Sequence, residues 1–287
     1  RGYDGYEMID VDSGKTLQRF VYGFGVQLDK GLKFSPDGRY LASNLAVWDV
    51  NASEPVLRYE PVKQSSAVAF TPDSRHLICC FVYVYPGKSR IVSYDTATWQ
   101  SIRQIELPQP STIENLAVHP AGSYVATSET TPGSLHPGTG SAVKIWKSLD
   151  SWQPIQAIAY PYWAHGRDLV FSPDGSRLVF ACEPTRVYDF ASVLHGEPHS
   201  MELLPEYGLG NIGYSHNRNL MIVSAESVAG SIRLACFDTE TLQLVDDIEA
   251  PGLAFDPIRV NPARNLLVLT LSGTPLDGLE LSLWSFE

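Results

Sequence analysis

Hydrophobic and polar positions alternate in short runs along the whole chain, and turn-forming residues separate the runs. The clearest unit is GLKFSPDGRYLAS (Gly31 to Ser43), in which two apolar strands flank a tight turn. In its SPDG turn the proline fixes φ, the aspartate can bond the backbone two residues on, and the glycine accepts a positive φ. The unit therefore predicts a β-hairpin.

The hairpin is repeated along the sequence, so the chain is expected to be a repeat protein. From Phe34 in the first copy to Val260 in the sixth, the average spacing is about 45 residues, which is typical of four-stranded propeller blades. The other five copies are AVAFTPDSRHLIC (Ala67 to Cys79), LAVHPAGSYVATS (Leu116 to Ser128), DLVFSPDGSRLVF (Asp168 to Phe180), IGYSHNRNLMIVS (Ile212 to Ser224) and IRVNPARNLLVLT (Ile258 to Thr270).

A third and a fourth strand are expected after each hairpin, and the third often ends in an aromatic residue and an aspartate. Such third strands are VWDV (Val47 to Val50), VSYDT (Val92 to Thr96), VYDF (Val187 to Phe190) and CFDT (Cys236 to Thr239). These units resemble WD40 and YVTN-type β-propeller repeats. The Gly-His pair of many WD40 repeats is absent, and Trp-Asp is intact only at Trp48 and Asp49. The resemblance implies an all-β propeller of four-stranded antiparallel blades, with residues 1–287 as a single domain.

The strand count bears on the number of blades. Glu7 to Phe20 predicts a third and fourth strand before the first hairpin, and Leu279 to Glu287 predicts a third strand with no fourth after it. The predicted total of 25 strands is three short of seven blades. Residues upstream of Arg1 would supply those three, so we expect seven blades with N-terminal strands missing. A six-bladed ring is the alternative.

The charge, the apolar runs and the cysteines indicate which kinds of partner and which cellular compartment to expect. The formal net charge of −11 argues against a nucleic-acid partner, because phosphate contacts need clustered Lys and Arg. The longest apolar run, Leu77 to Tyr85, is far shorter than a membrane span, so no membrane partner is expected. Four cysteines without disulfide or metal-site spacing predict buried free thiols and a reducing, cytoplasmic location.

The loops of a propeller are where function is expected, and one loop is rich in aromatic residues. We expect the segment YPYWAHGRD (Tyr160 to Asp168) to contact a protein or peptide, since aromatic residues and arginine dominate interface hot spots. Alternatively, its rings fold over their own blade. The predicted contact residues, including three from other loops with glycines, are Tyr22, Phe24, Tyr160, Tyr162, Trp163, His165, Arg167 and Tyr207.

Three second strands end in a carboxylate, which predicts an acidic mouth of the central channel. Glu129, Glu183 and Glu226 lie 11 or 12 residues past equivalent positions of their hairpins. By analogy with WD40 proteins that insert a basic residue into the channel, the three would attract a Lys or Arg side chain of a partner. The alternative is three solvated strand ends.

No catalytic motif stands out, so no catalytic residue, metal site or cofactor is predicted. There is no G-x-S-x-G, Walker loop or dinucleotide fingerprint in the sequence. Ser192 to Pro198 is the only predicted helical turn. We therefore expect a non-enzymatic interaction scaffold. Two alternatives stay open: a Ca²⁺-dependent lactonase or esterase that uses the three glutamates, and a sensor or autoinhibitory domain of a larger protein.

Overall fold

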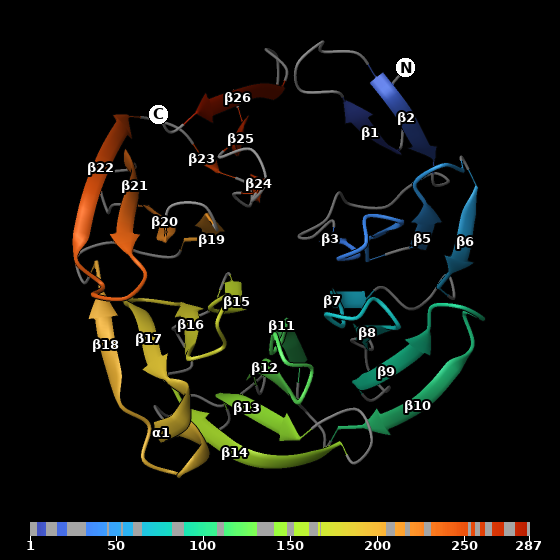
Figure 1. The fold of residues 1–287 in the computed structure, drawn as a ribbon, viewed down its shortest axis with the longest axis horizontal. Coiled ribbons are helices and arrows are strands. Elements are labelled where there is room, and N and C mark those ends of the chain that lie inside the picture. The colour runs from blue at the N-terminus through green and yellow to red at the C-terminus, as the bar shows by residue number, and fades with distance from the viewer. Residues whose placement is uncertain are drawn as a thin grey trace.

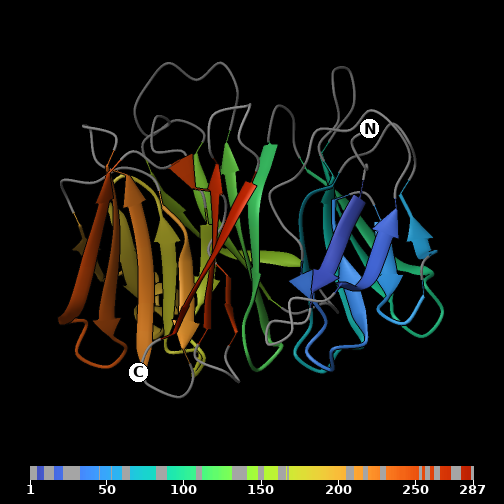
Figure 2. The same ribbon diagram turned by 90° about the horizontal axis from the view of Figure 1, so that it is seen from above.

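Tight turns between short apolar strands fold each group of four consecutive strands into one antiparallel sheet, and the sheets stand around a common axis (Figure 1). Figure 2 shows the strands running between the two ends of this ring. The computed structural model describes residues 5–9, 16–21, 33–44, 46–52, 54–59, 65–81, 89–107, 112–130, 141–147, 152–160, 166, 168–204, 210–215, 219–226, 231–251, 254–255, 259–261, 266–272 and 279–285.

Five sheets are complete, and in each the strands follow chain order from the axis outwards (Figure 1). They are β3 (Lys33–Phe34), β4 (Tyr40–Ala42), β5 (Ala46–Asp49) and β6 (Pro55–Arg58); β7 (Ser65–Phe70), β8 (His76–Phe81), β9 (Arg90–Asp95) and β10 (Ser101–Glu106); β11 (Thr112–Val118), β12 (Tyr124–Thr130), β13 (Ala142–Lys147) and β14 (Gln153–Ala159); β15 (Asp168–Phe171), β16 (Arg177–Ala181), β17 (Thr185–Asp189) and β18 (Ser200–Leu203); and β19 (Ile212–Ser215), β20 (Leu220–Glu226), β21 (Ser231–Asp238) and β22 (Leu244–Pro251).

The remaining strands belong to the first and last parts of the chain. β1 (Gly5–Ile9) and β2 (Thr16–Val21) form the predicted hairpin. In the last sheet β25 (Leu266–Ser272) pairs with β26 (Leu279–Ser285) on one side and with both β23 (Ala254–Phe255) and β24 (Arg259–Asn261) on the other. β23 precedes the predicted hairpin of Ile258 to Thr270. The propeller architecture is as expected, and the seven-bladed ring stays a prediction.

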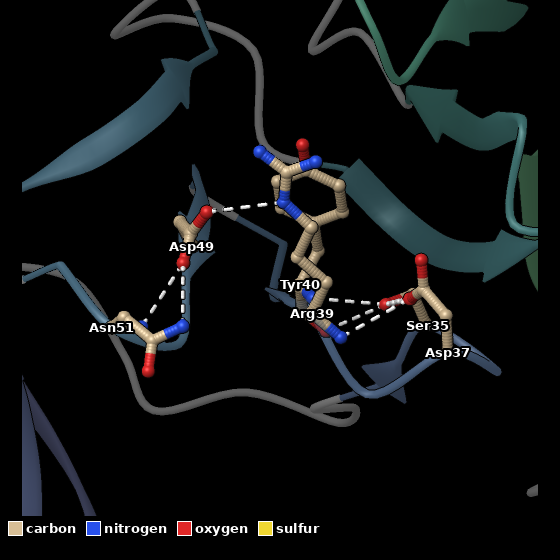
Figure 3. Close-up of polar contacts among 6 residues, drawn as sticks. All are labelled: Ser35, Asp37, Arg39, Tyr40, Asp49 and Asn51. Atoms are coloured by element: carbon tan, nitrogen blue, oxygen red, sulfur yellow. Dashed lines mark hydrogen bonds and ion pairs between the residues drawn. The ribbon is translucent and has the colours of Figure 1, made fainter.

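The SPDG turn forms for the reasons that its residues suggest (Figure 3). Asp37 Oδ1 accepts hydrogen bonds from Ser35 Oγ at 2.5 Å and from Arg39 N at 3.1 Å, and Gly38 has φ +73°. Ser35 Oγ in turn accepts from Tyr40 N at 2.8 Å. The same arrangement recurs at Thr71 to Asp73 and at Ser172 to Asp174.

The first turn of a sheet also contacts its third strand. Arg39 Nε lies 3.3 Å from Asp49 Oδ2, and Asp49 Oδ1 accepts from Asn51 N at 3.0 Å (Figure 3). The two connections therefore lie at the same end of the sheet. We call this the turn end of the ring, and the opposite end, where the second strand leads to the third and the fourth to the next sheet, the loop end.

Neighbouring sheets meet at the turn end through polar contacts. Asp37 N donates to Ser74 Oγ at 3.1 Å. His119 Nδ1 accepts from Ala121 N at 3.1 Å, so its other nitrogen, Nε2, carries the proton and donates to Gly175 O at 3.1 Å. These bonds connect the β3–β6 sheet to β7–β10 and the β11–β14 sheet to β15–β18.

The cores lie between facing sheets, because alternate strand residues point to opposite sheet surfaces. Tyr40, Leu77 and Phe70 pack between the β3–β6 and β7–β10 sheets. All four cysteines are buried and free, as predicted, and burial raises the pKa of Cys79 to about 12. Four such clusters fill the spaces between the described sheets from β3 to β22.

Helix α1 (Phe190–Leu194) begins earlier than the predicted helical turn at Ser192. Asp189 is its N-cap, and its Oδ1 accepts from Ser192 N at 2.7 Å. The buried side chains of Phe190 and Val193 fix the helix against the core. Aspartate at the end of the third strand therefore starts the helix, two residues earlier than predicted.

Candidate interaction site

The loop end of the β11–β14 sheet carries a buried ion pair. The Glu129 side chain on β12 is only 2% exposed, and its Oε2 lies 2.6 Å from Lys144 Nζ on β13. A buried carboxylate needs such a partner, because an uncompensated charge away from water is costly. The expectation of a free negative charge at Glu129 is therefore corrected: Lys144 neutralises it.

A chain of hydrogen bonds extends from this ion pair across the two strands. Trp146 Nε1 donates to Thr127 Oγ1 at 2.9 Å, and Thr127 Oγ1 donates to Glu129 Oε1 at 3.2 Å. The indole only donates, the hydroxyl does both, and the carboxylate only accepts, so each group has a suitable partner. The network fixes the carboxylate from two directions.

Tyr160 follows β14 and is the one predicted contact residue of the aromatic loop that the structure describes. It is 2% exposed, and its ring centroid lies 4.9 Å from that of Phe180. Its hydroxyl donates to Glu129 O at 3.1 Å, and burial raises its pKa, which keeps it protonated. Tyr160 is a core residue that anchors the start of the loop, and the expectation of an exposed contact ring is corrected.

The other end of the loop is anchored by an asparagine. Asn115 Nδ2 on β11 donates to Gly166 O at 2.8 Å and to Ser128 Oγ at 2.9 Å. A Cβ built on Gly166 would lie 1.9 Å from Phe180 Cε2, so only glycine permits this approach. Tyr160 and Gly166 therefore both attach the aromatic loop to the β11–β14 sheet.

Further polar contacts order the same end. Thr130 Oγ1 donates to Glu114 Oε1 at 3.2 Å, and Glu114 occupies a register shift between β11 and β12. Asp168 Oδ2 accepts from Ile212 N at 3.3 Å, which links the β15–β18 sheet to β19–β22. Asn115, Lys144 and these contacts were missed by the sequence analysis. The available signals were the run of polar residues from Thr127 to Thr130 at the end of β12, and Lys144 between apolar residues of β13.

Glu183 differs from Glu129, because it is exposed in the connection between β16 and β17. Next to it, Cys182 Sγ donates to Pro184 O at 3.1 Å, and burial raises the pKa of this thiol to about 12. Arg186 Nη2 lies 3.1 Å from Glu202 Oε1. Of the two predicted mouth carboxylates whose side chains the structure describes, Glu183 is the one that faces solvent.

The other predicted site residues lie partly or wholly outside the described part of the chain. Glu226 ends β20 opposite Ile232 of β21, and the structure does not describe its side chain. The predicted contact residues outside the described part of the chain are Tyr22, Phe24, Tyr162, Trp163, His165, Arg167 and Tyr207.

Among the described residues, no three His, Cys, Asp or Glu side chains gather in a way that could hold a metal ion. Within the same residues, no helix is long and apolar enough to cross a membrane.

Comparison with known proteins places the fold. No protein-family model matches the chain, and no curated protein matches it. Among solved structures, it is similar to the β-propeller domain of Cps50 (Swd1) from Myceliophteria thermophila, at 14% identity and a TM-score of 0.70 over 98% of this chain and 90% of that one. It is also similar to Kuenenia stuttgartiensis hydrazine synthase, at 14% identity and a TM-score of 0.71 over 96% and 90%. With the radial four-stranded sheets, these likenesses show that the chain has a WD40-type β-propeller fold.

Proposed function

We propose that the chain is a non-enzymatic interaction module that binds a protein or peptide at the loop end of the ring. The observation that carries this proposal is the attachment of the aromatic loop at both ends. Tyr160 donates to Glu129 O, and Asn115 donates to Gly166 O, so Tyr160 and Gly166 are both fixed to the β11–β14 sheet. Fixed loop ends lower the entropy lost on binding. Tyr162, Trp163, His165 and Arg167 are the proposed contacts, with Tyr22, Phe24 and Tyr207 from other loops.

A basic group is the proposed chemistry of the partner. Glu183 is exposed at the loop end, and the chain has a net charge of −11. Glu226 is proposed to act with Glu183, whereas Glu129 is already paired with Lys144. A partner that presents a Lys or Arg side chain would be attracted by this charge, with an affinity that falls as salt is added.

The fold alone does not separate binding from catalysis, since one of the similar structures is a β-propeller domain and the other is named a hydrazine synthase. Thermal unfolding with EDTA and with Ca²⁺ distinguishes the classes. A module without a metal should show the same unfolding temperature in both. A lower temperature in EDTA would instead favour the Ca²⁺-dependent hydrolase.

The binding proposal is tested by comparing the proteins that the wild type and two variants recover from a lysate. Trp163→Ala and Glu183→Lys should each lose the same specific partner. Glu197→Lys is the matched control, because it makes the same charge change on an exposed residue after α1, at the turn end. If both loop-end variants recover what the wild type recovers, the proposed face is wrong.

A further inference from the structure

The outer strands of the ring carry a repeated irregularity. In four of the five complete sheets the pairing of the third with the fourth strand shifts register by one residue, and the β1–β2 hairpin shifts in the same way. Each shift leaves one extra residue on the outer strand, which is a β-bulge. The extra residues are all aliphatic and exposed: Leu17, Val56, Ile102, Ile155 and Val245.

These bulges affect what the rim of the ring can bind. An outer strand has a free edge, and a regular free edge pairs readily with another extended chain. A bulge interrupts the ladder and twists the strand, so such an edge no longer matches an incoming strand. β6, β10, β14 and β22 are therefore poor sites for strand addition.

The fourth strand of the remaining complete sheet, β18, is regular. Its pairs with β17 run without a shift from Thr185 opposite Leu203 to Tyr188 opposite Ser200. The connection before it explains the difference. Helix α1 joins β17 to β18, whereas the described third-to-fourth turns of the β7–β10 and β19–β22 sheets are tight and contain Trp99 and Leu242 at positive φ.

The orientation of the β18 backbone follows from one hydrogen bond. Asp189 N donates to His199 O at 3.0 Å, so His199 faces β17. Because backbone groups alternate along an antiparallel strand, Met201 and Leu203 also bond towards β17. The N–H and C=O groups of Ser200 and Glu202 therefore point away from the sheet, at the free edge that Figure 1 shows on the rim.

The side chains along β18 define what would match this edge. Met201 is 49% exposed and lies opposite Val187, on the same sheet surface as the buried Leu203. Glu202 lies on the other surface, and its carboxylate is half exposed beside Arg186. An incoming strand would thus meet an apolar residue on one surface and an acidic one on the other.

We propose that the outer edge of β18 is a second binding site, which takes an extended peptide of alternating apolar and basic residues as a fifth strand. Main-chain hydrogen bonds to Ser200 and Glu202 would supply affinity, and Met201 and Glu202 would select the side chains. The net charge of −11 favours the basic positions. This site lies on the rim, so it is independent of the proposed function at the loop end.

The test uses a defined probe, the fluorescent peptide acetyl-Val-Lys-Val-Lys-Val-amide, titrated with the 287-residue chain in low salt while anisotropy is measured. The wild type should bind the probe. Glu202→Pro removes the outward N–H and retains the bonds to β17, so the dissociation constant should rise about tenfold. Glu202→Gln retains that N–H and loses only the charge, so the rise should be about two- to threefold. An unchanged constant for Glu202→Pro, or no binding by the wild type, overturns the proposal.

A second measurement needs no variant of the protein. Two versions of the probe carry N-methyl groups on alternate amides, one on its odd and the other on its even residues. A strand added to an edge uses only one of these sets, so one version should lose binding and the other should retain it. Equal binding of both methylated probes would overturn strand addition and leave only electrostatic attraction.

Discussion

At three equivalent positions the β7–β10 sheet carries apolar side chains, whereas the β11–β14 sheet carries polar and charged ones. By register, Cys79, Phe81 and Val92 of the first sheet correspond to Thr127, Glu129 and Lys144 of the second. In the first sheet the three side chains belong to an apolar cluster against β3–β6. In the second they form the hydrogen-bonded ion pair, and the backbone oxygen of Glu129 accepts from Tyr160 at the start of the aromatic loop. The repeat therefore fixes position and orientation, and does not fix whether the space between two sheets is apolar or polar.

The largest expected effect comes from breaking the ion pair. Lys144→Val copies Val92 of the neighbouring sheet and leaves Glu129 buried without its partner. Because Lys144 is partly exposed, we expect a loss of about 2–3 kcal/mol in the free energy of unfolding, measured with urea. Adding Glu129→Phe, which copies Phe81, should restore stability to within about 1 kcal/mol of the wild type. A double variant as unstable as the single one would show that the two sheets are not interchangeable here.

The next effect compares one turn in two settings. Gly38 and Gly175 have nearly the same positive φ, +73° and +74°. A Cβ on Gly38 meets nothing within 4 Å, whereas on Gly175 it would lie 2.4 Å from His119 Nε2. We expect Gly38→Ala to cost about 1 kcal/mol and Gly175→Ala about 2–3 kcal/mol in urea unfolding. Equal losses would mean that the His119 contact adds nothing to the backbone strain.

A smaller effect tests the loop attachment. Asn115 occupies the position of Ala67 in the neighbouring sheet, so Asn115→Ala makes the two sheets alike. It removes the donor to Gly166 O and should cost about 1–2 kcal/mol. Hydrogen exchange of the amide of Gly166 should become faster. Unchanged exchange would show that the asparagine does not hold the loop.

The smallest effect concerns acid. Hydrogen bonds from the Thr98 hydroxyl and the Thr98 backbone N–H lower the pKa of Asp95 below its usual value of 3.8. The backbone N–H of Ala97 lowers it further, by a smaller amount. Thr241 does the same for Asp238 in the β19–β22 sheet. A lowered folded-state pKa stabilises the fold above the unfolded value, and this contribution is lost as pH falls through the folded value. Asp95→Asn should therefore lose less thermal stability than the wild type between about pH 5 and pH 2. Parallel curves would contradict this role.

The features that could be predicted from the sequence are those that depend on residues close together in the chain. The strands and turns depend on neighbours within a few residues, so alternation and the SPDG turn sufficed to predict them. The partner of Glu129 lies 15 residues away in the chain, and the burial of this carboxylate depends on how the second and third strands align. The same short pattern, a strand ending in a carboxylate, gave a buried Glu129 and an exposed Glu183.

The bulges on the outer strands were also beyond the sequence analysis. An extra residue changes the register of a pair by one position, and an aliphatic residue such as Ile102 or Val245 fits an ordinary alternating pattern. The β18 strand shows the opposite case, since its regularity depends on the helix before it. A bulge or a regular register can be recognised only when the positions of both paired strands are known.

The locality of the sheets has a consequence for synthesis on the ribosome. Every complete sheet pairs strands that follow one another in the chain, so its backbone ladders can close within about 45 residues of translated sequence. Each new sheet would then pack on the one made before it, from the N-terminal side onwards. Until the next sheet is made, the newest one offers an apolar surface to chaperones.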